Sequence, residues 1–574
     1  MADTEKPDTT LQETVTVEDG VPVGNPVFSE DEPATVYDVQ WRTLMAILSL
    51  SMANCCAAIA NTTNTIIRSQ IADLGDSALS SWVANSNLLV TLAFGPVLGS
   101  LSDRFGKRWF IIVASIFGIV GSVISGSAHK TTTIIAGNVL TGIANAGCIM
   151  GIPAAQEVTP NRLRPWTMGF SQALASAAVI AGTLGAGAFV KYQTWRWSYY
   201  LNAFVYGTTT VLVAAFYHPP PPGLRRQRTS VGELLARVDY PGILLLTGSI
   251  ASLLIGLTWG GTTYAWNAKQ VLATLIVGCV GLVVFGLYEW KGTANGIFDH
   301  RMFQSRNFPI LLFVCIVDGM LLLGVNVLFA QEIASTFTTD SVKIATILTP
   351  FLATSAFGCL PAGIIMARTK SYRTLLVACL LWCSLFTGLM ALLNENRLSW
   401  AYAFSALFGC GTAVTTVIPV VALALSVPSF LLGTAGTISV SCRALGGIVG
   451  ITIFTAIYNN KMGAALPADV GAVLGQAGLS DLIPAVLEAL ATQNPAALAA
   501  VPGLPASMIP TVAAAQATAN SYSWKYVWIA ISVIVAANAI VSCFLQPVAN
   551  KMNNHVESAL EVSDVRDKQM GGKL

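Results

Sequence analysis

Charged residues are scarce in this sequence. Only 10% of its 574 residues are Asp, Glu, Lys or Arg, whereas soluble domains carry about 25%. Hydrophobic residues make up 54% of the chain, so water cannot be its main solvent. The formal net charge is only +2, and such a balance gives no reason to expect a nucleic acid or another polyanion as partner. The composition therefore predicts a membrane protein rather than a soluble one.

Motifs for metals, disulfides and nucleotides are also missing. The eleven cysteines lie within or beside apolar runs, and the four histidines are far apart without HExxH or CxxC spacing. We therefore expect neither a disulfide framework nor a metal site. The sequence has no GxxxxGK[ST] loop for ATP phosphates, and its loops supply no combination of nucleophile, base and orienting group. We expect no cofactor and no enzymatic activity, with an ion gradient as the energy source.

Apolar runs of about 20 residues recur along the chain, and each is long enough to cross a hydrocarbon core of about 30 Å as a helix. The polar and loop-forming residues between these runs divide them into fourteen predicted transmembrane helices. We therefore expect an all-α polytopic membrane protein. The expected spans lie near residues 43–64, 82–101, 109–127, 132–154, 167–190, 197–217, 241–259, 270–290, 308–330, 343–366, 374–393, 400–424, 433–457 and 525–546.

Basic residues predict the orientation of these spans. They cluster before the first span, after every second span and after the last one, for example at Arg42, Arg104 and Lys551. The positive-inside rule makes these loops cytoplasmic, so both termini should be cytoplasmic. Residues 1–38 hold ten acids against Lys6 alone and lack the pattern of a secretory signal. We expect them to form most of a disordered cytoplasmic tail.

One short cytoplasmic loop concentrates charge between two apolar spans. The stretch "GSLSDRFGKRWF", residues 99–110, holds Asp103 among three basic residues. Cytoplasmic loops are basic in any case, and a glycine at position 106 permits a tight turn. Neither fact requires an acid, so we interpret the stretch as a gate in which paired charges hold helices in one arrangement. The gate residues are Gly99, Asp103, Arg104, Gly106, Lys107 and Arg108, with Glu157 or Arg162 as the expected partner.

This loop resembles the Gly-x-Leu-x-Asp-Arg-x-Gly-Arg/Lys-Arg motif of the major facilitator superfamily. "EVTPNRLR", residues 157–164, resembles the loop after the fourth span, and "WRWSYYLN", residues 195–202, resembles the entry to the sixth span of drug:proton antiporters. Fourteen spans fit the branch with two extra helices. The stretch "SCRALGGIVGITIFTAIYNNK" and the long loop after it are similar to those of the fungal trichothecene efflux pump-like group.

The resemblance implies two six-helix bundles with two extra helices between them. A fainter repeat supports this division, because "GIIMARTKSYR" aligns Gly363 with Gly99 and Arg368 with Arg104. The expected domains are a cytoplasmic tail at 1–41, an N-terminal bundle at 42–217, a linker with two extra helices at 218–306, a C-terminal bundle at 307–546 with an extracellular loop at 459–523, and a cytoplasmic tail at 547–574.

Two charged residues are expected near the bilayer midplane. Asp318 and Arg443 each lie about eleven residues from the cytoplasmic start of their spans, where a charge costs about 2.5 to 3.5 kcal/mol. Asp318 is our candidate proton carrier, with Arg443 as its neighbour in proton coupling. A fixed structural pair, or an arginine bonded to backbone carbonyls, remains open. Glu332, at the outer end of the same span as Asp318, is expected to be solvated.

Uncharged polar residues within the spans are candidates for a substrate cavity, because the resemblance implies a cavity lined by the first and fourth spans of each half. The candidates are Asn54, Asn61, Asn138, Gln172, Asn326, Thr412 and Thr415. For each of them a hydrogen bond between helices is an equally open interpretation.

These observations predict a proton-coupled secondary transporter that exports hydrophobic or amphipathic small molecules, such as toxins, secondary metabolites or drugs, by alternating access. Its partners would be the substrate, protons and the lipid bilayer, and we expect a monomer in a fungal plasma membrane. Proton-driven import of an iron siderophore is the alternative, since residues 181–187 keep only part of the antiporter motif. A membrane sensor that does not transport is a third hypothesis.

Overall fold

The apolar runs form long helices, because a segment in hydrocarbon must satisfy its backbone hydrogen bonds internally. The computed structural model describes residues 41–75, 79–219, 239–260, 264–291, 297–338, 341–394, 396–428, 431–491, 498, 501–548 and 552. The expected tails, apart from a few residues next to the first and last spans, lie outside the described residues, as does most of the linker before the seventh span. All the described residues belong to one unit, Tyr37–Leu574.

Six membrane helices come from the first half of the chain. They are α1 (Trp41–Ala60), α3 (Ser80–Phe105), α4 (Lys107–Gly126), α5 (Thr131–Cys148) with its continuation α6 (Gly151–Glu157), α7 (Arg164–Tyr192) and α8 (Arg196–Phe216). The short elements η1 (Asn61–Ile66) and α2 (Ile67–Leu74) follow α1. In this bundle α1 packs on α7 and α8, and α4 packs on α5 and α8.

The remaining membrane helices follow in two groups. The extra pair is α10 (Tyr240–Trp259) and α11 (Lys269–Lys291), and η4 (His300–Gln304) precedes the second bundle. That bundle holds α12 (Asn307–Gly319), the π-helical turn η5 (Met320–Gly324), α13 (Val325–Thr336), α14 (Ser341–Thr369), α15 (Tyr372–Met390), α16 (Leu398–Ser426), α17 (Leu432–Gln476) and α20 (Ile509–Ser542). The elements α12, η5 and α13 together form one span.

The fourteen expected spans all fall on helices. Within the described ranges, thirteen helices are long and apolar enough to cross a membrane. The helix outside that count is α8, with 21 residues, and it packs between α1 and α4 in the first bundle. The chain is therefore a multi-pass, all-helical membrane protein.

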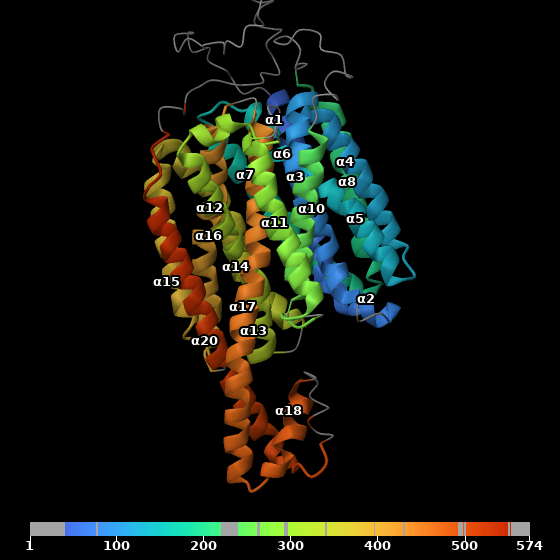
Figure 1. Cartoon of the computed structure of the whole chain (residues 1–574), viewed down its shortest axis with the longest axis vertical. Coiled ribbons are helices and arrows are strands. Elements are labelled where there is room, and N and C mark those ends of the chain that lie inside the picture. Colours follow the sequence, from blue (N-terminus) through green and yellow to red (C-terminus); the bar gives the residue numbers. More distant parts are fainter. Residues whose placement is uncertain are drawn as a thin grey trace, which may run out of the picture. The chain divides into compact units, whose positions relative to one another are not determined.

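Two helix pairs make the largest contacts between the bundles. Helix α3 packs against α17, and α7 packs against α14. The extra helix α10 covers the first of these contacts, where Leu254 packs with Leu89 of α3 and Ile448 of α17 in one apolar cluster. Figure 1 shows α10 and α11 in front of α3, on the side where α17 lies.

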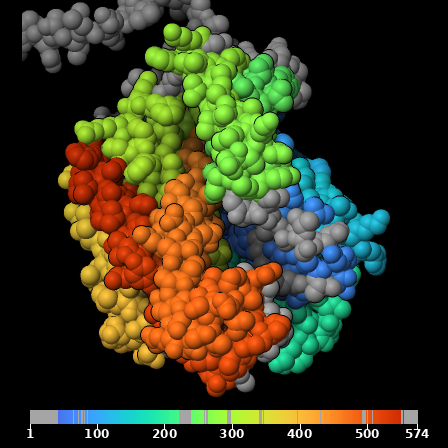
Figure 2. Space-filling model, turned by 60° about the horizontal axis from the view of Figure 1, so that its bottom comes forward, coloured from blue at the N-terminus to red at the C-terminus, as the bar shows by residue number. Residues whose placement is uncertain are grey.

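Helices α17 and α20 extend well beyond the expected spans. Residues 459–523, expected as a loop, continue α17 to Gln476, form η7 (Ser480–Leu482), α18 (Ile483–Ala491) and η8 (Ala506–Met508), and begin α20 at Ile509. Their apolar side chains form a separate core, so this region is a folded helical cap. Figure 1 shows its helices as a packed group at the end of the molecule away from the labels of α1 and α6, and Figure 2 shows orange residues packed together at the lower edge of the view.

Candidate functional site

Asp103 joins the two bundles at the end of α3. Its Oδ1 accepts a hydrogen bond from the backbone N–H of Gly433 at 3.0 Å, and its Oδ2 accepts from the backbone N–H and the hydroxyl of Thr434 at 2.7 and 2.8 Å. The first N–H groups of a helix have no partners within it and carry a partial positive charge. A carboxylate from the first bundle therefore accepts the hydrogen bonds of the free N–H groups at the start of α17 in the second bundle.

Lys107 supplies the positive charge beside this contact. Its Nζ lies 2.9 Å from Asp103 Oδ1 and also pairs with Glu157 at the end of α6. Only 7% of the Lys107 side chain and 6% of the Asp103 side chain are exposed. Buried charges are tolerated when they are paired, so the three groups form one cluster next to the α17 N-terminus.

The rest of the charged loop makes different contacts. Arg108 donates to the carbonyl of Ala214 in α8 at 2.9 Å and lies 2.8 Å from Nε2 of His218, which follows that helix. Arg104 is half-buried. Of the two expected partners, Glu157 does join the loop, through Lys107. Arg162 is exposed in the turn after α6 and makes no hydrogen bond or ion pair with the described residues, so the expectation that it could hold the gate is not supported.

Glycines bring the bundles into contact at equivalent points of the two halves. A side chain at Gly99 of α3 would clash with Thr437 of α17, and one at Gly363 of α14 would clash with the backbone carbonyl of Pro165 in α7. The aligned glycines of the repeat thus occupy the two inter-bundle contacts. The repeat does not extend to the charges, because Arg368 is exposed and an alanine, Ala367, stands where the first half has Asp103.

Asp318 and Arg443 meet in the interior of the second bundle. Arg443 Nε lies 2.7 Å from Asp318 Oδ2, and the hydroxyl of Thr415 donates to Asp318 Oδ1 at 2.9 Å. A second hydroxyl, of Thr416, lies 3.4 Å from the same oxygen, while Arg443 Nη2 donates to the Thr416 carbonyl at 3.0 Å. The Asp318 side chain is 1% exposed. The predicted neighbours are therefore an ion pair that links α12, α16 and α17.

The backbone around this pair is unusually close. A side chain at Gly319 would clash with the carbonyl of Arg443, and one at Gly446 would clash with the carbonyl of Ile316. Directly after Gly319 the helix changes to the π-helical turn η5, a feature often found at functional sites. The acid therefore lies at a tight helix crossing beside an irregular turn.

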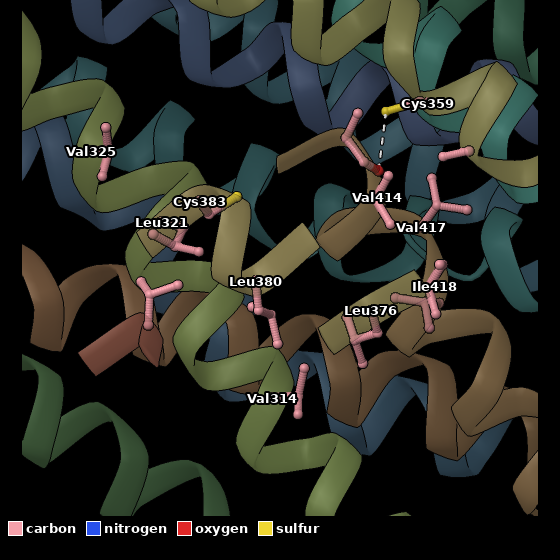
Figure 3. Packing of buried hydrophobic residues seen from close by; sticks show 14 of the residues in the cluster. Val314, Leu321, Val325, Cys359, Leu376, Leu380, Cys383, Val414, Val417 and Ile418 are labelled. Atoms are coloured by element: carbon pink, nitrogen blue, oxygen red, sulfur yellow. Dashed lines mark hydrogen bonds between the residues drawn. The ribbon is translucent and has the colours of Figure 1, made fainter. Parts of the chain in front are cut away.

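Apolar side chains fill the core around the pair. Figure 3 shows Val314 and Leu321 from the span of Asp318 together with Leu380 of α15 and Val414 of α16. Water is excluded from such a core, which strengthens electrostatic interactions inside it.

The other cavity candidates fall into small groups. Asn54 of α1 donates to Gln172 of α7 at 2.8 Å, and Asn138 donates to the carbonyl of Val83 in α3 at 3.0 Å. Each therefore makes the helix-to-helix bond that was the open alternative.

Among the described residues, no hydrogen bond joins the remaining candidates to these groups. Thr412 lies 3.4 Å from the hydroxyl of Ser355, beside the Thr415 that binds Asp318. Asn61 is exposed at the start of η1 and donates to the carbonyl of Ala57 in the last turn of α1, while Asn326 is half-buried.

A buried amide network in the first bundle was not anticipated. Asn145 donates to Asn87 at 2.9 Å, Asn87 donates to Thr141 at 2.9 Å, and the Tyr206 hydroxyl donates to Asn145. These groups come from α3, α5 and α8, whose separation in sequence gives no local signal. All four side chains are neutral, so the network needs no counterion.

Glu332 was expected to be solvated, and this expectation is wrong. The residue is 2% exposed, and its Oε2 accepts a hydrogen bond from Trp528 Nε1 of α20 at 3.0 Å. The partner lies 196 positions away in the sequence, so the neighbours of Glu332 in the chain could not reveal its burial.

A polar latch lies at the entry to α8. Asp73 at the end of α2 accepts hydrogen bonds from Trp195 Nε1 and Arg196 Nη1, each at 3.0 Å. These donors, together with the charge of Arg196, lower the pKa of the Asp73 carboxyl. The "WRWSYYLN" segment thus ties α8 to the segment after α1. Within the described residues, no group of three or more His, Cys, Asp or Glu could hold a metal ion.

Comparison with known proteins gives consistent matches over most of the chain. The family described as "Fungal trichothecene efflux pump (TRI12)" matches residues 26–570. "MFS transporter L2" of a Phoma species is 27% identical over 540 residues, which are 92% of this chain and 86% of that protein. "Efflux pump FUS6" of Gibberella moniliformis is 29% identical over 70% of this chain and 72% of that protein.

Solved structures support the fold. The proton:xylose symporter XylE matches with a TM-score of 0.50 at 15% identity, over 86% of this chain and 94% of its own. The human organic anion transporter MFSD10 matches with the same TM-score at 11% identity. Both are major facilitator proteins, and at such identities the likeness concerns the arrangement of helices alone.

Proposed function

The chain belongs to the fungal trichothecene efflux pump family, and from this premise we propose that it exports hydrophobic or amphipathic small molecules in exchange for protons. The observation that carries the proposal is the buried pair of Asp318 and Arg443. An acid deep in a membrane bundle has a functional explanation when it binds and releases a proton. We further propose a plasma-membrane location, cytoplasmic termini and a monomeric state.

In this proposal Asp318 carries the exchanged proton. Protonation at a carboxylate oxygen would remove the negative charge that faces Arg443 and leave the guanidinium with neutral acceptors, such as the Thr416 carbonyl. An unpaired buried charge is costly, so Arg443 would move to a new environment when Asp318 is protonated. Because α12 and α17 are in close contact at Gly319 and Gly446, such a movement of Arg443 would shift α17 against α12.

Helix α17 connects the ion pair with the gate. Its first turn binds Asp103, and Arg443 follows Thr434 by nine positions, which is about 14 Å along a helix. A displacement of α17 would therefore loosen the bonds between its N-terminus and Asp103. Alternating access by rocking of two bundles requires that the contact between Asp103 and the N-terminus of α17 forms and breaks in turn.

The polarity of the interior supports the proposed substrate class. Apolar side chains surround the ion pair of the second bundle, and such an interior suits bulky, weakly polar molecules better than sugars or anions. The family name, and the efflux pumps among the relatives, support a toxin or secondary metabolite as the cargo.

The test is the accumulation of labelled compounds in cells that lack their own pumps. A sesquiterpenoid toxin, a cationic dye and a ferric siderophore would be compared with and without the protein, before and after the proton gradient is collapsed. We expect lower accumulation of the toxin, reversed by the protonophore. Higher accumulation of the siderophore would instead establish import and reject the proposal.

A further inference from the structure

Glu332 is a buried acid that the proposed exchange at Asp318 does not use. It lies on α13, fourteen positions after Asp318 in the same span, which is about 21 Å along a helix. Within the described part of the chain, its side chain accepts one hydrogen bond, which comes from Trp528. The two acids of this span therefore occupy different depths and have different partners.

No described cation compensates Glu332. On the helices that pack on α13, Arg443 of α17 pairs with Asp318. The other charged side chains of these helices are exposed or half-buried; they are Lys343 and Arg368 of α14, Lys461 and Asp469 of α17, and Lys525 of α20. The titratable group that faces Glu332 is the Tyr458 hydroxyl of α17, which donates to Asn520 at 2.6 Å. Asp318 has an arginine, whereas Glu332 has a neutral indole. A buried carboxylate without a cation is unfavourable and is relieved when the group takes up a proton.

The surroundings of Glu332 form the junction between the bundle and the cap. Trp524 of α20 donates to the Ser335 hydroxyl at 3.0 Å, and Asn520 donates to the Ser335 carbonyl at 3.0 Å. The Tyr458 and Trp524 rings lie 4.5 Å apart. These contacts hold α13, α17 and α20 together at the point where α17 and α20 leave the bundle (Figure 1). Ionisation of Glu332 would place a charge inside this aromatic junction.

We propose that Glu332 is a second proton-binding site, beside the part of α17 that leaves the bundle for the cap. A proton from water forms an O–H bond at Oε1, while Oε2 keeps the hydrogen bond from Trp528. The same O–H bond breaks when the junction opens to water. The proton site stands on the contacts of Glu332 alone, whereas its part in export rests on the proposed function.

Infrared spectroscopy of the full-length protein in lipid nanodiscs tests the site without any substrate. We expect the wild type at neutral pH to show the C=O band of a protonated buried carboxyl, and Glu332→Gln to lose that band. Glu488→Gln is the matched control, because Glu488 lies exposed on α18 and an exposed carboxyl is ionised at this pH. A Glu332→Gln spectrum that superimposes on the wild type would overturn the proposal.

A second variant covers the case in which Glu332→Gln does not fold. Trp528→Phe removes the hydrogen bond to Oε2 and should move the same C=O band to higher frequency, since hydrogen bonding weakens a carbonyl. A folded Trp528→Phe protein with an unmoved band would also overturn the proposal. If the wild-type protein shows the C=O band of Glu332 but exports none of the test compounds from cells, the proposed function is rejected and the proton site remains.

Discussion

The two bundles satisfy their buried polar groups in different ways. In the interior of the first bundle, Asn145, Asn87 and Tyr206 bind one another as neutral groups. In the interior of the second bundle, Asp318 faces Arg443. A neutral network does not change with proton concentration, whereas an ion pair does. In the proposed mechanism, this difference places the proton-dependent step in the second bundle, which would move against the first.

The largest effect on stability should come from breaking the ion pair. Arg443→Ala leaves the Asp318 carboxylate buried without its cation, and the loss should be about 3 to 5 kcal/mol of unfolding free energy. Thermal unfolding of the purified protein measures this. The double variant Asp318→Asn with Arg443→Gln should recover most of the loss, and equal instability of the single and double variants would contradict the pairing.

The gate should affect turnover more than folding. Asp103→Asn keeps one acceptor oxygen for the N-terminus of α17 but removes the charge that faces Lys107. We expect about a tenfold slower export, because a charge-assisted hydrogen bond contributes about 1.5 to 3 kcal/mol. The export rate per molecule in the membrane is the measurement. Arg162→Ala, at an exposed position, should export at the wild-type rate; a defect equal to that of Asp103→Asn would show that the gate is misassigned.

The amide network should contribute a smaller stability without pH dependence. Asn145→Ala removes hydrogen bonds that are worth about 0.6 kcal/mol each between membrane helices. We expect a slightly lower unfolding temperature and an export rate that depends on pH as in the wild type. A changed pH profile would assign a proton-dependent role to the first bundle and remove the contrast between the two.

The smallest effect is expected at the Asp73 latch. The pKa of Asp73 is lowered in the folded protein, so its ionised form stabilises the fold above the unfolded pKa of about 3.9. This stabilisation is lost as the pH falls through the lower, folded value. Asp73→Asn should therefore destabilise the protein slightly at neutral pH and not at pH values below both pKa values. Unfolding temperatures across this range test the sign.

Local sequence patterns were sufficient for the membrane helices and for the acids of the gate and the ion pair. An apolar run of about 20 residues specifies a helix in lipid whatever its neighbours are, and a charge such as Asp318 stands out against such a run. The contact of Asp103 with Gly433 was not predictable in the same way, because 330 positions separate the two residues.

The cap and Glu332 show where local patterns fail. Residues 459–523 are rich in Ala and Pro, so their helical periodicity is weak. The signal was present only in apolar pairs at i and i+4, such as Val470 with Leu474 and Val486 with Leu490, which form the core of the cap. Glu332 lies near the end of its span, where solvation is the ordinary expectation, and only the packing of α20 buries it.

Transport by purified protein in liposomes tests the central claim most directly. An imposed pH gradient should drive uphill movement of the substrate by the wild type. Asp318→Asn should retain exchange of substrate for substrate but lose the movement driven by the gradient, because the exchanged proton has no carboxylate to bind. If Asp318→Asn still couples transport to the gradient with the pH dependence of the wild type, then the ion pair in the second bundle is not the site of proton exchange.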